Sequence, residues 1–219
     1  MDEGWTRYAF DTFNVPYSSL KDPDVKAGNL DSKYDVIVLP SQRGREIIEG
    51  NAAGSLPEEY TGGIGETGVS NLKEFVNRGG TMLCFDASCQ LPIEQFHLPI
   101  KNVLESLKSS EFYCPGSIVA LELDNKNPIT ATLPTTLPGY FINSSAFSTT
   151  DSRVRIVARY AKDNVLLSGW LLGEDKLRGQ IALAEVPFGK GRVVLFAFRP
   201  QHRGQTCRLA GYATSCRWS

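Results

Sequence analysis

Cys89 is the residue whose type and position most directly suggest chemistry. It follows an apolar run at 81–85 and precedes a helix-like segment at 91–96. A cysteine between a strand and a helix is typical of a nucleophile elbow, and a nearby helix N-terminus would lower its pKa. An elbow requires very small residues two positions before and after the nucleophile, where this chain has Ala87 and Leu91. Since leucine would crowd the turn, the pattern favours an ordinary loop cysteine over a catalytic one.

Two histidines, His97 and His202, are the imidazole bases that this sequence offers. His97 lacks the further ligands of a zinc site. His202 lies just beyond the last strong strand, close to Arg199 and Arg203, and two arginines at a strand's carboxyl end could bind a carboxylate or phosphate. An internally salt-bridged loop is the commoner outcome. Cys89 with His202 gives one alternative function, a cysteine-dependent hydrolase or amidase, which requires the two side chains to reach hydrogen-bond distance.

Two further segments are candidate binding elements. The sequence 60–68 contains a G-x-G-x-x-G match, but a polar loop precedes it where a dinucleotide site would have a strand. Its backbone amides could still line an anion site at the following helix. Trp170 stands next to a glycine at a predicted strand exit, where it could stack on a ligand or pack over the sheet. The candidate binding residues are therefore Tyr60, Gly63, Gly65, Glu66, Trp170, Arg199, His202 and Arg203.

These residues need a scaffold, and the first half of the chain predicts an α/β sheet. Apolar residues at helical spacing lead into Gly79-Gly80, which ends the helix, and a short buried strand follows at 81–85. The β-branched run 34–40 predicts a second strand, covered on both faces as in a parallel sheet. In such sheets chemistry occurs at the carboxyl ends of the strands. Cys89 would lie at that edge.

The second half is predicted to be mostly β. Gly189-Lys190-Gly191 indicates a hairpin between the last two strands. The expected strands are 15–20 in the first half and 118–123, 154–158, 165–168, 181–186 and 193–198 in the second, with a short helix at 103–107. The fold class predicted from this order is an α/β sheet, parallel in the first half and extended by antiparallel strands in the second.

Composition excludes several functions. The 219 residues carry 23 Lys and Arg against 24 Asp and Glu, a formal net charge of −1, which gives no electrostatic reason to expect nucleic acid or an anionic membrane. No apolar run approaches the ~20 residues that span a bilayer. The five cysteines form no C-x-x-C pair, so neither a zinc ribbon nor any other metal site is predicted. We expect one domain at 1–206 and an atypical tail at 207–219.

Several segments together resemble the region downstream of the catalytic domain in bacterial zinc carboxypeptidase A-like proteins. The segments are Asp2-Glu3-Gly4-Trp5-Thr6-Arg7, 34–40, 60–65, 112–117, 168–174 and 198–206. The resemblance implies a class I glutamine amidotransferase-like domain with a flavodoxin-like sheet. It also implies that the zinc belongs to an upstream peptidase domain, the expected partner, because the His-x-x-Glu zinc motif has no counterpart here. A secreted or periplasmic parent and no cofactor in this chain follow from the same resemblance.

The resemblance also bears on Cys89. Active amidotransferases of this class have Gly-x-Cys-x-Gly at the elbow and His-Pro-Glu after a late strand. This chain has Ala87-Ser88-Cys89-Gln90-Leu91 and Arg199-Pro200-Gln201 at the corresponding places. Arginine is not a base near neutral pH, and glutamine does not stabilise an imidazolium as a carboxylate does. The leading interpretation is a non-catalytic accessory domain. A small-ligand or glycan-binding module, taking a small anionic or peptide ligand, is a further alternative.

Overall fold

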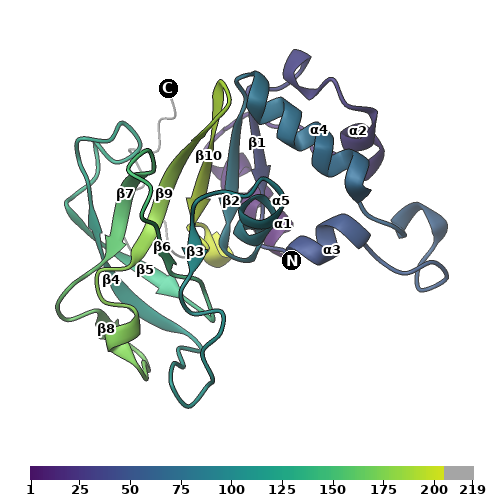
Figure 1. Cartoon of the computed structure of the whole chain (residues 1–219). Helices are drawn as coiled ribbons and strands as arrows, with labels where there is room; N and C mark the ends of the chain where they lie inside the picture. Colours follow the sequence, from purple (N-terminus) through teal and green to yellow (C-terminus); the bar gives the residue numbers. More distant parts are fainter. Residues whose placement is uncertain (205–219) are drawn as a thin grey trace.

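The computed structural model describes residues 1–204 and is built on one ten-stranded mixed sheet (Figure 1). The main path of the sheet runs β1-β2-β10-β9-β7-β4-β5. Its strands are β1 Val36–Leu39, β2 Thr81–Phe85, β4 Ser117–Leu123, β5 Thr136–Phe141, β7 Arg155–Tyr160, β9 Ile181–Phe188 and β10 Gly191–Phe196. Three short strands lie off this path: β3 Lys101–Asn102, β6 Phe147–Ser148 and β8 Leu166–Ser168.

The sheet divides into a parallel and an antiparallel part. β1 pairs parallel with β2, and β2 pairs parallel with β10, whereas every pairing from β10 through β9, β7 and β4 to β5 is antiparallel. The β9–β10 hairpin turns at Gly189-Lys190, as the glycines predicted. The predicted fold class, a parallel sheet extended by antiparallel strands, is therefore confirmed. In Figure 1 the helices gather around the parallel part, while the antiparallel strands curl away from it.

The longest helix in residues 1–204, α4 (Gly65–Arg78), packs its apolar face into the core. Its apolar side chains Leu72, Phe75 and Val76 are fully buried, and it ends where Gly79 adopts a φ of +128°. The helices are α1 Asp2–Thr12, α2 Asp22–Ala27, α3 Gly44–Glu49, α4 Gly65–Arg78 and α5 Gln90–Gln95. Short 3-10 turns occur at Leu30–Ser32, Glu58–Tyr60, Asp86–Cys89, Glu174–Lys176 and His202–Gly204. No helix within residues 1–204 is both long and apolar enough to cross a membrane.

Three local predictions were wrong. The segment 15–20 is not a strand, since Asn14 has a positive φ and Pro16 follows, and 103–107 is a turn region after β3 rather than a helix. β1 is an edge strand with Val36 48% exposed, so it is not covered on both faces. β5 was missed because it contains Pro138 and Gly139, which disfavour interior strands, but β5 lies at the far edge of the sheet, where proline is tolerated.

Candidate functional site

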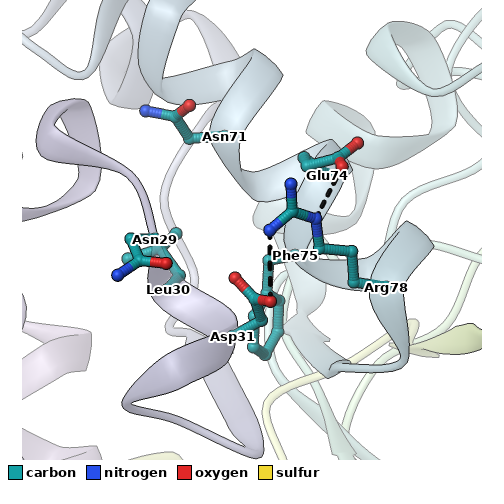
Figure 2. Close-up of a pocket in the computed structure, with 7 residues that line it drawn as sticks. All are labelled: Asn29, Leu30, Asp31, Asn71, Glu74, Phe75 and Arg78. Carbon is teal, nitrogen blue, oxygen red and sulfur yellow. Dashed lines mark hydrogen bonds and ion pairs between the residues drawn. The ribbon is translucent and has the colours of Figure 1, made fainter.

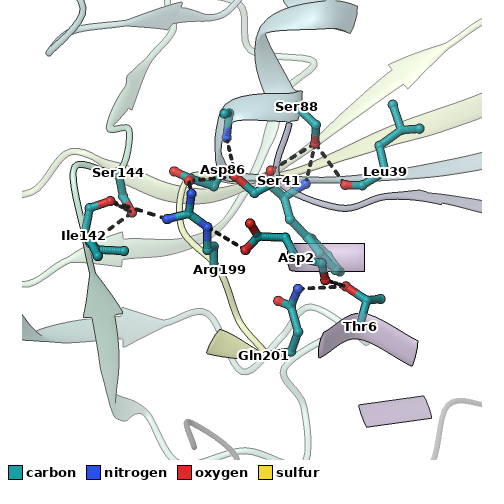
Figure 3. Close-up of polar contacts among 12 residues, drawn as sticks. Asp2, Thr6, Leu39, Ser41, Asp86, Ser88, Ile142, Ser144, Arg199 and Gln201 are labelled. Carbon is teal, nitrogen blue, oxygen red and sulfur yellow. Dashed lines mark hydrogen bonds and ion pairs between the residues drawn. The ribbon is translucent and has the colours of Figure 1, made fainter. Parts of the chain in front are cut away.

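The carboxyl ends of the three parallel strands bring together one polar cluster, shown in Figure 3. Ser41 follows β1, Asp86 follows β2 directly, and Arg199 follows β10. Ser41 Oγ donates a hydrogen bond to Asp86 Oδ2 at 2.9 Å, and Arg199 Nη2 lies 3.1 Å from the same oxygen. This is the edge at which parallel α/β sheets place their functional groups. We call the set Asp2, Ser41, Asp86 and Arg199 the strand-end cluster.

Asp86, and not Cys89, occupies the strained position of the strand-to-helix turn. Its φ is +51°, a left-handed value that is unfavourable for a residue with a Cβ and that is found where the surrounding structure enforces it. Ser88 Oγ fixes the turn by accepting a hydrogen bond from the Phe85 amide. The assignment of the elbow position to Cys89 was therefore three residues late. Asp86 is the first polar residue after the strand, but that pattern alone does not indicate which residue of the turn takes the positive φ.

Burial dominates the electrostatics of Asp86. Its side chain is 4% exposed, and burial raises the pKa of this carboxyl above its ordinary value. The Arg199 guanidinium and hydrogen bonds from Ser41 and Ser144 oppose that shift by favouring the ionised form. Asp86 thus has a positive charge and two hydroxyl donors around it, the environment of a structural carboxylate.

Cys89 lies beneath this cluster with no access to solvent. The side chain is 1% exposed, and its Sγ is 3.2 Å from two backbone acceptors, the carbonyl oxygens of Cys84 and Phe196. Burial raises the pKa of the Cys89 thiol well above its ordinary value, so the predicted lowering by a helix N-terminus was wrong. The following helix, α5, has six residues. Cys89 is a buried thiol, packed into the core rather than presented by a turn.

His202 does not contact Cys89. Its ring stacks on Tyr140 with ring centroids 4.4 Å apart, and no hydrogen bond in the described part of the chain joins it to the Cys89 thiol. Partial burial, followed by the nearby positive charges of Arg199 and Arg203, lowers the pKa of His202. The contact that a Cys89–His202 hydrolase requires is absent from residues 1–204.

Arg199 is paired internally rather than left open to a ligand. Its Nε lies 2.9 Å from Asp2 Oδ1, so one guanidinium joins the first residue of α1 to Asp86 after β2. A second link holds the same helix, since Gln201 Nε2 donates to Thr6 Oγ1 at 2.8 Å. The segment after β10 therefore fastens α1 over the strand ends (Figure 3). Sequence patterns did not connect residues so far apart in the chain.

The glycine-rich segment is used for close packing. A Cβ at Gly63 would lie 2.6 Å from the backbone of Ile47, Ile48 and Gly50, so the chain can approach α3 this closely only with glycine. The amides of Gly62 and Ile64 donate to the carbonyl oxygens of Asn51 and Ile47. Gly65 begins α4, Tyr60 and Glu66 are exposed, and the segment lies beside the helices of the parallel part (Figure 1).

Trp170 lies at the other end of the molecule. It follows β8, in the antiparallel part, and its side chain is 66% exposed. Ser117 Oγ bonds to both its backbone groups, accepting from the amide at 2.9 Å and donating to the carbonyl oxygen at 2.7 Å. Figure 1 places β8 and α3 on opposite sides of the fold. The binding-module alternative would combine Trp170, Arg199 and the glycine-rich segment, and the fold does not bring these three together. Arg203 is exposed beside the strand-end cluster.

A shallow pocket of about 260 Å³ lies elsewhere, between α4 and the turn at Leu30–Ser32 (Figure 2). Arg78 in this pocket is already paired with Glu74 at 2.7 Å and with Asp31 at 3.3 Å. Asn71 donates to two backbone carbonyl oxygens. The pocket adjoins the start of β2, at the amino ends of the strands. Within residues 1–204 no group of three or more His, Cys, Asp or Glu side chains is placed to hold a metal ion.

Comparison with known proteins identifies the fold. No protein-family model matches the chain, and no curated protein matches it in sequence. Among solved structures, a glutamine amidotransferase is similar with a TM-score of 0.52 and 16% identity, covering 96% of this chain and 95% of that one. PurLQS from Thermotoga maritima has a TM-score of 0.51 and 20% identity, covering 89% of this chain and 81% of that one. A cytoplasmic protein from Salmonella typhimurium has a TM-score of 0.55 and 13% identity, covering 89% and 74%.

The chain therefore has a class I glutamine amidotransferase-like fold, as the sequence resemblance implied. At these identities the likeness extends to the fold alone. The relation to a zinc carboxypeptidase stays a prediction from the sequence motifs, as do the accessory role and the secreted or periplasmic parent. The boundary predicted at residue 206 and the atypical tail at 207–219, with Cys207 and Cys216, lie outside or at the limit of the described residues.

Proposed function

We propose that this chain is a non-catalytic amidotransferase-like domain that serves a zinc carboxypeptidase-like partner domain. The observation that supports the first half of the proposal is the ion pair of Asp86 with Arg199, 3.1 Å between Oδ2 and Nη2, at the carboxyl ends of β2 and β10. In an active enzyme of this fold, a thiol and an imidazole would be needed at that edge. In this chain the Asp86 carboxylate and the Arg199 guanidinium occupy that edge and form an ion pair with each other.

The chemistry of this pair argues against acyl transfer. A guanidinium does not accept a proton near neutral pH, so Arg199 cannot activate a nucleophile as a general base. Asp86 accepts from Ser41 and is paired with Arg199, and both interactions draw electron density from its oxygens. Cys89 is buried, and within residues 1–204 its thiol contacts backbone carbonyl oxygens rather than a base. The expected result is no glutaminase or amidase activity above the buffer rate, and Cys89→Ser should leave any measured rate unchanged.

The accessory role rests on the sequence resemblance, whose motifs extend over most of the described chain. It predicts that the coding DNA upstream continues in frame into a domain with a His-x-x-Glu zinc motif and a distant second histidine. The direct test is to express that domain with and without the present chain. We expect this chain to raise its melting temperature or to bind it in a size-exclusion experiment. An upstream frame without such a motif would contradict the peptidase partner while leaving the non-catalytic assignment intact.

A further inference from the structure

The contacts of α1 are those of a helix held by a few polar links. Thr6 is its one buried residue, although Trp5, Ala9 and Phe10 are partly covered. Its polar links to the segment after β10 are the Asp2–Arg199 ion pair and the hydrogen bond between Gln201 and Thr6, and the ring of Tyr8 packs against Gly204. Helices in proteins are stabilised mainly by burial of an apolar face. α1 should therefore separate from the strand ends more readily than the core helix α4.

Asp2 places a carboxylate against Arg199 as an ion pair without hydrogen-bond geometry, since among residues 1–204 Arg199 Nε has no hydrogen-bond partner. The Nε–Oδ1 distance is 2.9 Å, and both side chains are only partly exposed, at 20% for Arg199 and 28% for Asp2. Arginine at the carboxyl end of a parallel strand is a suitable receptor for a carboxylate. If α1 moves away, Asp86 neutralises Arg199, and Arg203 nearby adds a positive charge. The local charge then favours an incoming anion.

A second, independent observation points to a ligand at this place. Gln201 is buried, and among residues 1–204 its Oε1 has no hydrogen-bond partner, although its Nε2 donates to Thr6. Figure 3 shows Nε2 of the Gln201 amide directed toward Thr6, with Oε1 on the other side of the amide. A buried acceptor without a donor is unfavourable. A molecule that enters between α1 and the strand ends could supply the missing N–H.

We propose that Arg199 and Gln201 form a binding site for a ligand that carries a carboxylate next to an N–H donor. In the present structure the site is covered by α1, and Asp2 of the same chain takes the place of the ligand's carboxylate. The ligand class is therefore the carboxyl terminus of a peptide or an N-acylated amino acid, with its carboxylate on Arg199 and its amide N–H on Gln201 Oε1. Binding replaces one carboxylate by another, so the main requirement is displacement of α1. The inference goes beyond the proposed function and does not depend on the peptidase partner.

The test uses N-acetylglycine as the probe, because it carries a carboxylate beside one amide N–H. Because Asp2 is tethered, it competes at an effective concentration in roughly the millimolar range or above, so wild-type binding should be weak. Asp2→Asn removes the competing charge and should lower the Kd by about tenfold. Asp11→Asn makes the same change on the exposed surface of the same helix and should leave the Kd unchanged. Titrations followed by the indole ¹H–¹⁵N signal of Trp5 would report α1 directly.

Two control ligands test the carboxylate and the N–H of the probe separately. N-acetylglycinamide lacks the carboxylate and should not bind, and acetate lacks the N–H and should bind more weakly than N-acetylglycine. Arg199→Met should abolish binding, and if this variant does not fold, the comparison of Asp2→Asn with Asp11→Asn decides alone. Equal affinity in those two variants, or no saturable binding in Asp2→Asn, would overturn the proposal. If Cys89 proves inactive and no variant binds N-acetylglycine, the non-catalytic assignment stands and the carboxylate site is refuted.

Discussion

At the scale of single residues, the site depends on which side chain stands at the strand end. The carboxyl edge could be located from sequence, because the helix, the glycine stop and strand 81–85 are all local patterns. The residue on the turn could not be assigned reliably, since a φ of +51° at Asp86 is enforced by contacts with Ser41 and Arg199 that are distant in sequence. The sequence favoured a salt-bridged loop around Arg199, and Arg199 does form ion pairs within the chain. The sequence did not show that its partners are Asp2 and Asp86.

His202 should make stability depend on pH. Because burial and nearby arginines lower its pKa, the unfolded state takes up a proton first as the pH falls. The stability contribution is present above the ordinary value of 6.5 and is lost as the pH falls toward the lower folded value. His202→Gln should flatten the decrease in unfolding free energy between about pH 7.5 and about pH 5.5, measured by urea denaturation. An equally steep slope in His202→Gln would refute this origin.

At the scale of elements, glycines and edge strands account for most differences between expectation and structure. The long segment before α4 is ordered by backbone contacts, because Gly63 lies against the end of α3 without room for a Cβ. β5 escaped prediction because Pro138 and Gly139 are strand-breaking by type, and only its place at the sheet edge makes them acceptable. Local patterns identified β2, β4, β9 and β10, whereas the sheet order depends on contacts between distant segments.

A pair of glycine substitutions tests this packing role. Gly63→Ala should lower the free energy of unfolding by about 1–3 kcal/mol, since its Cβ would meet backbone atoms at 2.6 Å that cannot move aside easily. Gly4→Ala, on α1, has no atom within 4 Å of the added methyl and should be neutral or slightly stabilising. Chemical denaturation of both variants measures the difference. Similar unfolding free energies for the two variants would show that the segment around Gly63 can shift to accommodate a methyl group, which would contradict a packing role for this glycine.

At the scale of the whole molecule, residues 1–204 carry a strand-end cluster and do not bring Cys89 and His202 into contact. The candidate binding residues are distributed between opposite sides of the sheet, with the glycine-rich segment near α3 and Trp170 after β8 (Figure 1). Only Arg199, His202 and Arg203 lie at the strand ends. We therefore propose a peptidase partner and a carboxylate ligand for this chain rather than a reaction.

The central claim, that this amidotransferase-like fold has no working nucleophile, is tested most directly by thiol labelling. In a Cys207→Ser, Cys216→Ser background, the native protein would be treated with iodoacetamide at about pH 8, where an ordinary thiol is partly ionised, and modified residues identified by mass spectrometry. Cys84, Cys89 and Cys114 are buried and burial raises the pKa of each, so none should react until denaturant is added. Rapid alkylation of Cys89 in the native state would contradict the account.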